Sequence, residues 1–212
     1  MDSVNLSLKK QGIKAVDALL KNRFDAKFYD DAKEVLNQLL SMIPQDATVG
    51  IAGSWTLQQL GIVEILEAKG NKIFCHNKSG LNSEEILEMR RKQLTCDVFL
   101  TSTNAITEDG RLVNTDATGN RVAAMTFGPK KVIIVAGANK VVKDINEAEK
   151  RIQSTAAPLN NKRLSKPNPC ASIGHCVDCQ GPTRLCNVTS VIHKCPPATN
   201  ISVLIVGEEL GY

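Results

Sequence analysis

The chain has 212 residues, of which 42% are hydrophobic, so it is long enough to bury one full core. It contains no run of 18 apolar residues and no apolar leader, so we expect no membrane span, no secretory signal and a cytoplasmic location. The net charge of +4 is spread over mixed acidic and basic residues, and aromatic residues make up only 4%. This composition argues against nucleic acid as a partner.

Hydrophobic spacing predicts two N-terminal helices, over 4–23 and 31–43, that precede the first strand. Beyond Ala47, β-branched runs alternate with stretches of helical spacing. The predicted strands cover 47–54, 72–76, 97–102 and 130–137, and the predicted helices cover 56–70, 83–96, 119–128 and 145–158. This alternation predicts an α/β fold with a mostly parallel open sheet and helices on both faces.

The last quarter of the chain has a different character. Pro158 is expected to end the helix before it, and polar residues then form an arm up to Cys170. Two strand-like runs, 187–194 and 201–211, follow a cysteine-rich loop, and we expect them to return to the sheet as a β-pair. We therefore divide one domain into N-terminal helices (1–44), an α/β core (45–160) and a cysteine-rich loop with C-terminal strands (161–212).

A glycine turn follows the first predicted strand of the core. Gly53 and Ser54 stand at the carboxyl end of this strand and just before a helix, where backbone N–H groups favour an anion. The sequence is neither a Walker loop nor a three-glycine dinucleotide motif. A purely structural role is the alternative, in which Gly53 permits a tight turn and Ser54 or Thr56 caps the helix.

A polar hairpin is predicted over 103–116, where Asp109 and Gly110 give a turn signal between two short β-prone pieces. Some of its polar residues are explained by turns and caps, but the segment is more polar than a plain hairpin needs. Polar groups near strand ends commonly orient a small ligand. The predicted ligand site combines the glycine turn with this region and consists of Gly53, Ser54, Asn104, Glu108, Asn114, Asp116 and Arg121.

Four cysteines lie close together near the end of the chain, with the spacing C-x5-C-x2-C-x6-C: Cys170, Cys176, Cys179 and Cys186. Four thiols at this density are able to enclose Zn²⁺ or an iron–sulfur cluster, so we expect one of these cofactors. The spacing matches neither the ferredoxin run nor a zinc ribbon. A reduced structural loop and a redox or disulfide role are the alternatives, and a reducing cytosol disfavours the disulfide.

Several long motifs occur in an order that resembles a known family. They are "GIAGSWTLQQLGI", "TNAITEDGRLVNTDATGNRVAAMTFGPKKVIIVAGANKVV", "RIQSTAAPLN", "CVDC", "RLC" and "VGEELGY". Together they resemble the lactate-utilisation (LUD) domain family over nearly the whole chain after about residue 25. The resemblance implies a fold like the superfamily of glucosamine-phosphate deaminases, ribose-phosphate isomerases and CoA-transferases. It also implies a role in bacterial L-lactate oxidation beside iron–sulfur proteins.

A more distant similarity bears on catalysis. The segment "VFLTSTNAITEDGRLVNTDATG" is similar to sugar-phosphate isomerases of the methylthioribose-phosphate type, in which an aspartate transfers a proton. Asn104 stands at the best-matching position, and an amide has no carboxylate with which to do so. Glu108 in "TEDG" is a loose counterpart of the glutamate nucleophile of CoA-transferases, although the spacing differs. Glu108 is therefore the candidate catalytic residue.

The sequence thus favours a protein that binds a small anionic metabolite and supports the oxidation of L-lactate or a related 2-hydroxy acid, with iron–sulfur oxidoreductase subunits as partners. One alternative is a stand-alone transferase or isomerase that handles acyl groups or phospho-sugars. Another is a metal-carrying assembly module. Self-association into a homo-oligomer is left open by the sequence.

Overall fold

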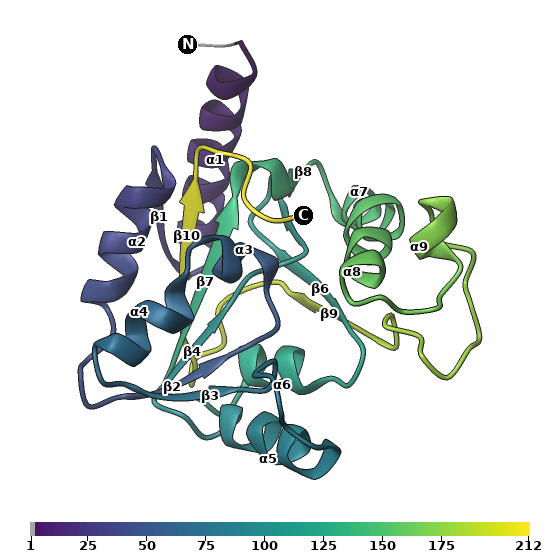
Figure 1. Ribbon diagram of the computed structural model, residues 1–212. Coiled ribbons are helices and arrows are strands. Elements are labelled where there is room, and N and C mark those ends of the chain that lie inside the picture. Colours follow the sequence, from purple (N-terminus) through teal and green to yellow (C-terminus); the bar gives the residue numbers. More distant parts are fainter. Residues whose placement is uncertain (1–2) are drawn as a thin grey trace.

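The computed structural model describes residues 3–212, and a six-stranded sheet lies at its centre (Figure 1). The six strands are β1 (Asp25–Tyr29), β2 (Thr48–Ile51), β3 (Lys72–Cys75), β4 (Val98–Thr101), β7 (Lys131–Gly137) and β10 (Asn200–Val206). Their order is β1-β10-β7-β4-β2-β3, and each neighbouring pair is parallel. The central strands β7 and β10 are almost wholly buried, as expected for a parallel sheet covered on both faces.

A second sheet of four strands packs against the first. It contains β5 (Ala105–Thr107), β6 (Leu112–Asp116), β8 (Val141–Val142) and β9 (Val188–Ile192), in the order β8-β5-β6-β9. Strands β5 and β6 form the predicted antiparallel hairpin, which is confirmed. Its turn needs Gly110, which has φ 81°, and a Cβ there would lie 2.5 Å from the carbonyl carbon of Ala18 in the first helix.

Helices cover both faces of the six-stranded sheet. Their bounds are α1 (Ser3–Lys21), α2 (Ala32–Ser41), α3 (Trp55–Gln59), α4 (Ile62–Ala68), α5 (Ser83–Gln93), α6 (Asn120–Thr126), α7 (Ile145–Arg151), α8 (Ala157–Arg163) and α9 (Cys170–Ile173). Apolar side chains of α2, α3 and α4 share one core with the sheet. Helices α1 and α6 and the second sheet share another core on the opposite face. The predicted α/β architecture is therefore confirmed.

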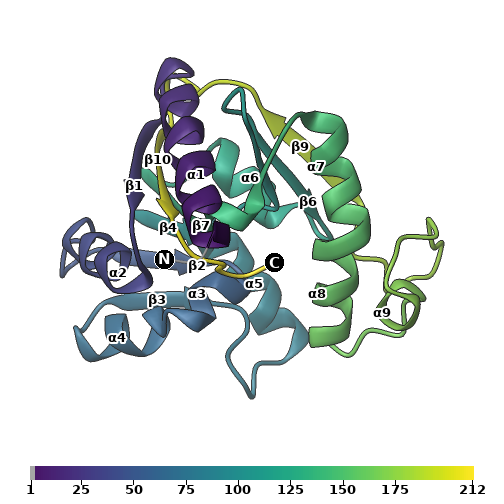
Figure 2. The same cartoon turned by 90° about the horizontal axis from the view of Figure 1, so that it is seen from above.

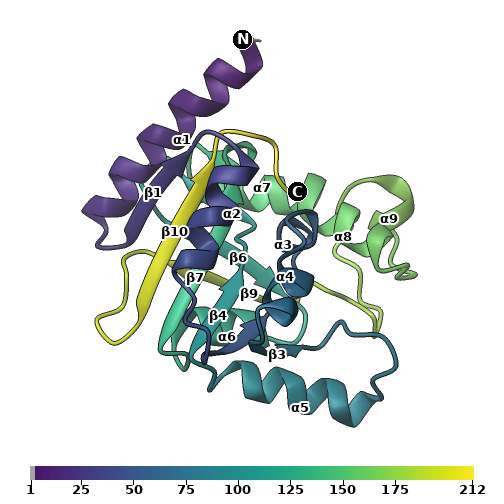
Figure 3. The same cartoon turned by 60° about the vertical axis from the view of Figure 1, so that its left-hand side comes forward.

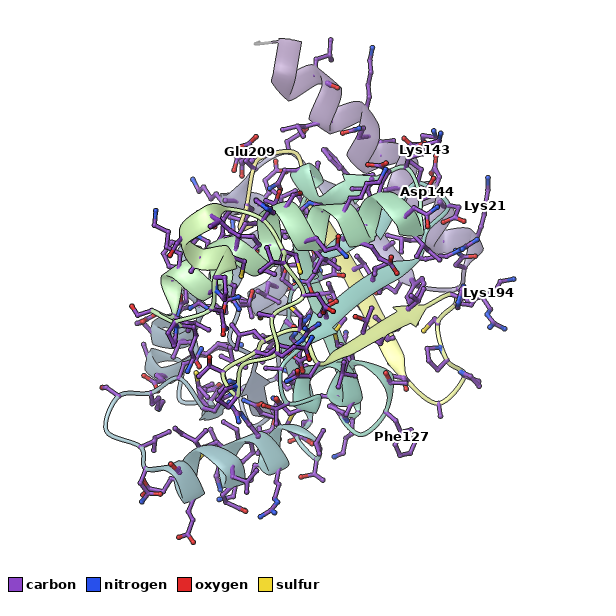
Figure 4. All side chains as sticks on the ribbon, turned by 90° about the vertical axis from the view of Figure 1, so that its right-hand side faces the viewer. Lys21, Phe127, Lys143, Asp144, Lys194 and Glu209 are labelled. Carbon is purple, nitrogen blue, oxygen red and sulfur yellow. The ribbon has the colours of Figure 1, made fainter. Side chains whose placement is uncertain are left out.

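Polar N-caps begin several of these helices. The side chain of Asp31 accepts the backbone N–H of Glu34 at the start of α2. Asn82 and Glu85 form a reciprocal capping box at the start of α5. Asp144, labelled in Figure 4, caps α7 in the same way as Asp31 caps α2. Each cap satisfies a backbone donor that the first helical turn leaves without a partner.

Helices α7 and α8 form one continuous rod that lies against the outer face of the second sheet (Figure 2). A π-helical turn over Ile152–Ala156 joins them. The prediction that Pro158 ends this helix is wrong, because Pro158 lies in the first turn of α8, where a missing N–H is tolerated. Part of the predicted arm from Pro158 to Cys170 is therefore helical.

The N-terminal prediction also needs a correction. Strand β1 lies between α1 and α2, so the first strand does not follow two helices. Lys27 and Asp25 interrupt the apolar residues of this short strand, and it lies at the edge of the sheet, where a mixed pattern is tolerated. Helix α1 packs beside β1, and its N-terminal turns extend past the sheet (Figures 1 and 3).

The last two strands return to the body of the protein but do not form the predicted β-pair. Strand β9 pairs antiparallel with β6 at the edge of the second sheet, whereas β10 lies between β1 and β7. Half-exposed residues suit β9 to an edge, and the continuous apolar run of β10 suits it to the centre.

The stretch predicted as one helix over 56–70 forms two short helices. Gly61, with φ 61°, divides this stretch into α3 and α4.

Phe127, just after α6, is 72% exposed and points away from the body (Figure 4). None of the helices in the described residues combines the length and apolar composition that crossing a bilayer requires.

Candidate functional site

A cavity of about 590 Å³ opens at the carboxyl edge of the six-stranded sheet. Residues that directly follow the strands form its wall: Gly53 and Ser54 after β2, His76 after β3, Asn104 beyond β4 and Lys140 beyond β7. The π-helical turn and α8 supply another side. Ligands of open α/β sheets bind at this edge, because the loops there converge from several strands.

The cavity lining is strongly cationic. Asp116 is the single Asp or Glu among the lining side chains in the described part of the chain. Six lining side chains are basic: Arg90, Arg121, Lys140, Arg163, Lys166 and Arg184. This excess of positive charge at a concave surface favours an anionic ligand, because the field of a cleft with low-dielectric walls is screened little by solvent.

Arg121 has a structural task in this wall. Its Nη1 donates to Asn114 Oδ1 at 2.6 Å, and its Nη2 donates to Asn104 Oδ1 at 3.0 Å. The backbone carbonyls of Ser102 and Thr115 accept its other two Nη hydrogens, at 3.3 and 2.8 Å. Its Nε lies 3.5 Å from Asp116, as expected of an ion pair.

With every N–H engaged, Arg121 positions the hairpin and has no donor left for a ligand. Burial lowers the pKa of Arg121, and Asp116 opposes this shift. The guanidinium therefore stays paired with a carboxylate that offsets its desolvation.

Two asparagines connect the strand end to the hairpin. Asn114 is fully buried, and its Oδ1 also accepts the backbone N–H of Asn104 at 3.2 Å. Asn104 Oδ1 in turn accepts the N–H of Thr115 at 2.9 Å. The carbonyl of Asn104 accepts from Arg151 Nη1 at 2.6 Å, which ties α7 to the same strand end.

Lys140 lies at the end of a short 3-10 turn (Ala138–Lys140) and is 2% exposed. Its Nζ donates to Thr56 Oγ1 at 2.8 Å and to Ser102 Oγ at 2.9 Å. Burial lowers the pKa of Lys140 to about 7, and the positive charges of Arg151 and Arg121 contribute to this shift. Lys140 is thus a buried amine that gains or loses its proton near neutral pH.

The C-terminal segment returns to this edge beside β8 (Figure 1). The Nδ2 of Asn139 donates to the carbonyl of Gly211 at 3.1 Å. Arg163 Nε donates to Tyr212 Oη at 2.8 Å, and this phenol donates to Asn160 Oδ1 at 3.0 Å. Burial raises the pKa of Tyr212. Tyr212 therefore presents a fixed neutral phenol at the rim of the cavity.

Arg90 and His76 occupy the α5 side of the cavity. The Nε of Arg90 is buried and has no hydrogen-bond partner among the described residues. His76 Nδ1 lies 3.0 Å from Gln93 Nε2, so it accepts a hydrogen bond from this amide. Burial lowers the pKa of His76, which favours the neutral imidazole. The Arg90 guanidinium therefore lines the cavity without a carboxylate partner within the described residues.

The structure places the sequence-predicted ligand residues in three groups. The first lines the cavity and contains Gly53, Ser54, Asn104, Asp116 and Arg121. Asn114 stands behind this wall. Glu108 lies outside the cavity, and its carboxylate pairs with Lys14 of α1 at 2.6 Å.

The glycine turn has the structural role that was its alternative interpretation. Ser54 Oγ accepts the N–H of Leu57 at 3.3 Å and so caps α3. A Cβ at Gly53 would lie 2.9 Å from Asn77 Nδ2, so a larger residue there would displace the Asn77 side chain. Both residues nevertheless line the cavity, with Ser54 largely buried.

The four cysteines of the C-terminal loop are free thiols. Burial raises the pKa of Cys170 and of Cys186, and the nearby Cys176 and Cys179 raise both further. Within residues 3–212, however, no three His, Cys, Asp or Glu side chains are grouped closely enough to hold a metal ion. Metal binding by this loop stays a prediction, and it requires the thiols to move together.

Arg184 holds the cysteine loop together by hydrogen bonds to residues of the loop itself. Its Nη1 donates to the carbonyl of Cys179 and to Asp178 Oδ1, each at 2.6 Å, and its Nε donates to the carbonyl of Cys186 at 3.0 Å. Asp178 in turn donates its backbone N–H to Cys176 Sγ at 3.3 Å. Cys186 and Arg184 both line the cavity, so the loop forms part of its wall.

Sequence reasoning did not single out Arg90 and Lys166 of the cavity lining. It also missed four further residues of the cavity region: Lys140, Arg151, Arg163 and Tyr212. The sequence does contain an indication of Lys140, because a lysine between the apolar runs "VIIVAG" and "VV" is expected to be buried with them. Arg151 and Arg163 have the helical spacing of ordinary surface charges, and Tyr212 belongs to no periodic element. Only the tertiary structure brings these three to the site.

The fold and the cavity define an α/β protein with a cationic site at the carboxyl edge of a parallel sheet. The model of the LUD domain family matches residues 13–206, so the chain belongs to this family. The crystal structure of a DUF162 family protein from Deinococcus radiodurans is similar, with a TM-score of 0.54 and 14% identity. The match covers 94% of this chain and 98% of that chain, and it supports the fold. No curated protein shows significant sequence similarity to the chain.

Proposed function

We propose that the cavity binds a small carboxylate-bearing metabolite during the oxidation of L-lactate or a related 2-hydroxy acid. Membership of the LUD domain family makes the chain a lactate-utilisation-type protein. The proposal goes further than family membership in two respects: the protein binds a small acid, and iron–sulfur oxidoreductase subunits are its partners. The observation that carries it is the cationic lining of the cavity: Arg121 pairs with Asp116 and Arg184 with Asp178, whereas three other basic side chains form no salt bridge within the described residues, namely Arg90, Arg163 and Lys166.

The local contacts favour a carboxylate over a neutral ligand. Asp116 already pairs with Arg121, so it neutralises little of the remaining positive charge. Arg90 lines the cavity and forms no salt bridge within the described residues, so a carboxylate would give its guanidinium a charge-assisted partner. A cavity of about 590 Å³ also has ample room for a small acid.

Isothermal titration calorimetry with L-lactate, pyruvate and lactamide tests this proposal. Lactamide has the shape of lactate without its charge, so we expect it not to bind. Arg90→Gln should weaken binding of the acid by about tenfold or more, because it removes a charged donor. Arg91→Gln is the matched control, since Arg91 is the exposed neighbour of Arg90 on α5. Equal binding of acid and amide, or equal effects of the two variants, would contradict the proposal.

The alternative of a stand-alone transferase or isomerase receives little support from the geometry. The Glu108 carboxylate is engaged by Lys14 outside the cavity, and Asn104 stands where the related isomerases need an aspartate. Glu108→Gln should therefore leave acid binding unchanged. A variant that loses binding or turnover would restore the transferase alternative.

A further inference from the structure

Among the described residues, Lys140 is the one lysine that lies in the cavity wall at 2% exposure. A lysine buried for structural reasons usually pairs with a carboxylate that offsets the cost of desolvation. Among the described residues, no Asp or Glu forms a salt bridge with Lys140, and its two Nζ partners are the hydroxyls of Thr56 and Ser102. The fold therefore holds this amine at the site without a carboxylate partner.

The surroundings of Lys140 favour the neutral amine. Burial lowers its pKa to about 7, and Arg151 and Arg121 act in the same direction, so much of the amine is unprotonated at neutral pH. A hydroxyl either accepts from an ammonium or donates to a neutral amine, so the same two hydroxyls suit both protonation states. A desolvated lysine near other cations is an activated nucleophile.

We infer that the Lys140 amine forms an imine with the carbonyl carbon of a 2-oxo acid bound in the cavity. The inference rests on the proposed function and names its substrate class. An amine forms an imine only with a carbonyl carbon, and the cationic lining favours a carboxylate. A 2-oxo acid carries these two groups on adjacent carbons, whereas a 2-hydroxy acid has no carbonyl carbon outside its carboxylate.

The chemistry balances without an added oxidant. The lone pair of Lys140 Nζ forms a C–N bond to the carbonyl carbon, and the carbonyl oxygen takes up the proton that nitrogen loses. This hydroxyl takes up the second proton of the nitrogen and leaves as water as the C=N bond forms, so a neutral amine and a carbonyl give a neutral imine and one water. Ser102 and Thr56 lie within hydrogen-bond distance of Nζ, so their hydroxyls are placed to pass these protons.

Reductive trapping tests the inference on the full chain. The protein is incubated with pyruvate or 2-oxoglutarate and sodium cyanoborohydride, which reduces an imine to a stable secondary amine, and the modified lysine is mapped by mass spectrometry. We expect one adduct per chain, on Lys140, whose formation becomes faster as pH rises through about 7. L-lactate should give no adduct. Lys140→Gln should reduce trapping at least about tenfold.

Lys143→Gln is the matched control, because Lys143 is exposed at the surface three residues further along the chain (Figure 4). It should trap pyruvate as the unchanged protein does. Mapping on the unchanged protein keeps the test decisive even if Lys140→Gln does not fold. No adduct, or modification of Lys143 at the same rate as Lys140, would overturn the inference. If no adduct forms, calorimetry of the unchanged protein with pyruvate shows which proposal fails. Binding of pyruvate without an adduct overturns only the imine, whereas absence of binding overturns the proposed function as well.

Discussion

Replacing Lys140 with methionine should change how stability depends on pH. The pKa of Lys140 is 10.5 in an unfolded chain and about 7 in the folded protein, so between these values the unfolded state holds one more proton. Stability therefore rises with pH through this window and is lost as pH falls toward 7. At about 1.4 kcal/mol per pKa unit, the full effect is about 5 kcal/mol, and about 2 kcal/mol of it falls between pH 7 and pH 9.

Urea denaturation at pH 7, 8 and 9 measures this effect. The free energy of unfolding of the unchanged protein, minus that of Lys140→Met, should increase by about 2 kcal/mol across the series. Packing effects of methionine do not depend on pH, so they cancel in the change. Lys130→Met is the control, because Asp97 raises the pKa of the exposed Lys130, which stays charged throughout. A constant difference for Lys140→Met would refute the reasoning about the buried amine.

Three other variants give separate tests. Gly211→Ala should destabilise the protein by about 1–3 kcal/mol in urea denaturation, because Gly211 has φ 68° and a Cβ would lie 2.2 Å from Thr56 Oγ1. Asn114→Ala should cost about 2 kcal/mol in the same assay, because Arg121 loses its 2.6 Å acceptor; an unchanged midpoint would contradict this role. Protein purified without oxygen should carry near-stoichiometric zinc or iron that Cys176→Ser releases, and metal-free unchanged protein would end the cysteine-site prediction.

The sequence predicts the layers of the fold better than the connections between them. Runs such as "VIIVAG" in β7 are apolar because both faces of the strand are covered, and this pattern is local. The neighbours of a strand are not local. Strand β10 reads as a buried strand, but nothing in its own residues indicates that it pairs with β1 and β7 instead of β9.

The candidate site was predicted in part for the same reason. Asn104 and Asp116 lie at the open end of the β5–β6 hairpin, next to the strand ends, and both reach the cavity. Glu108 is at the turn end of the same hairpin, where α1 packs, and so it meets Lys14. The sequence shows that these residues share a hairpin, but only its placement in three dimensions separates the two ends. Lys140 stands between two apolar runs, which indicates burial, but the sequence does not show that this burial places it in the cavity wall.

The position of β10 has a consequence for how the protein is made. Ser202 of β10 donates to Asp25 of β1 across a separation of 177 residues, and β1 has β10 as its partner in the sheet. During synthesis β1 and β7 therefore emerge with unpaired edges that stay open until β10 is released from the ribosome. Such long-range closure slows folding, and exposed edges promote aggregation. We expect any truncation before Asn200 to leave β1 without its strand partner and β7 with an open edge.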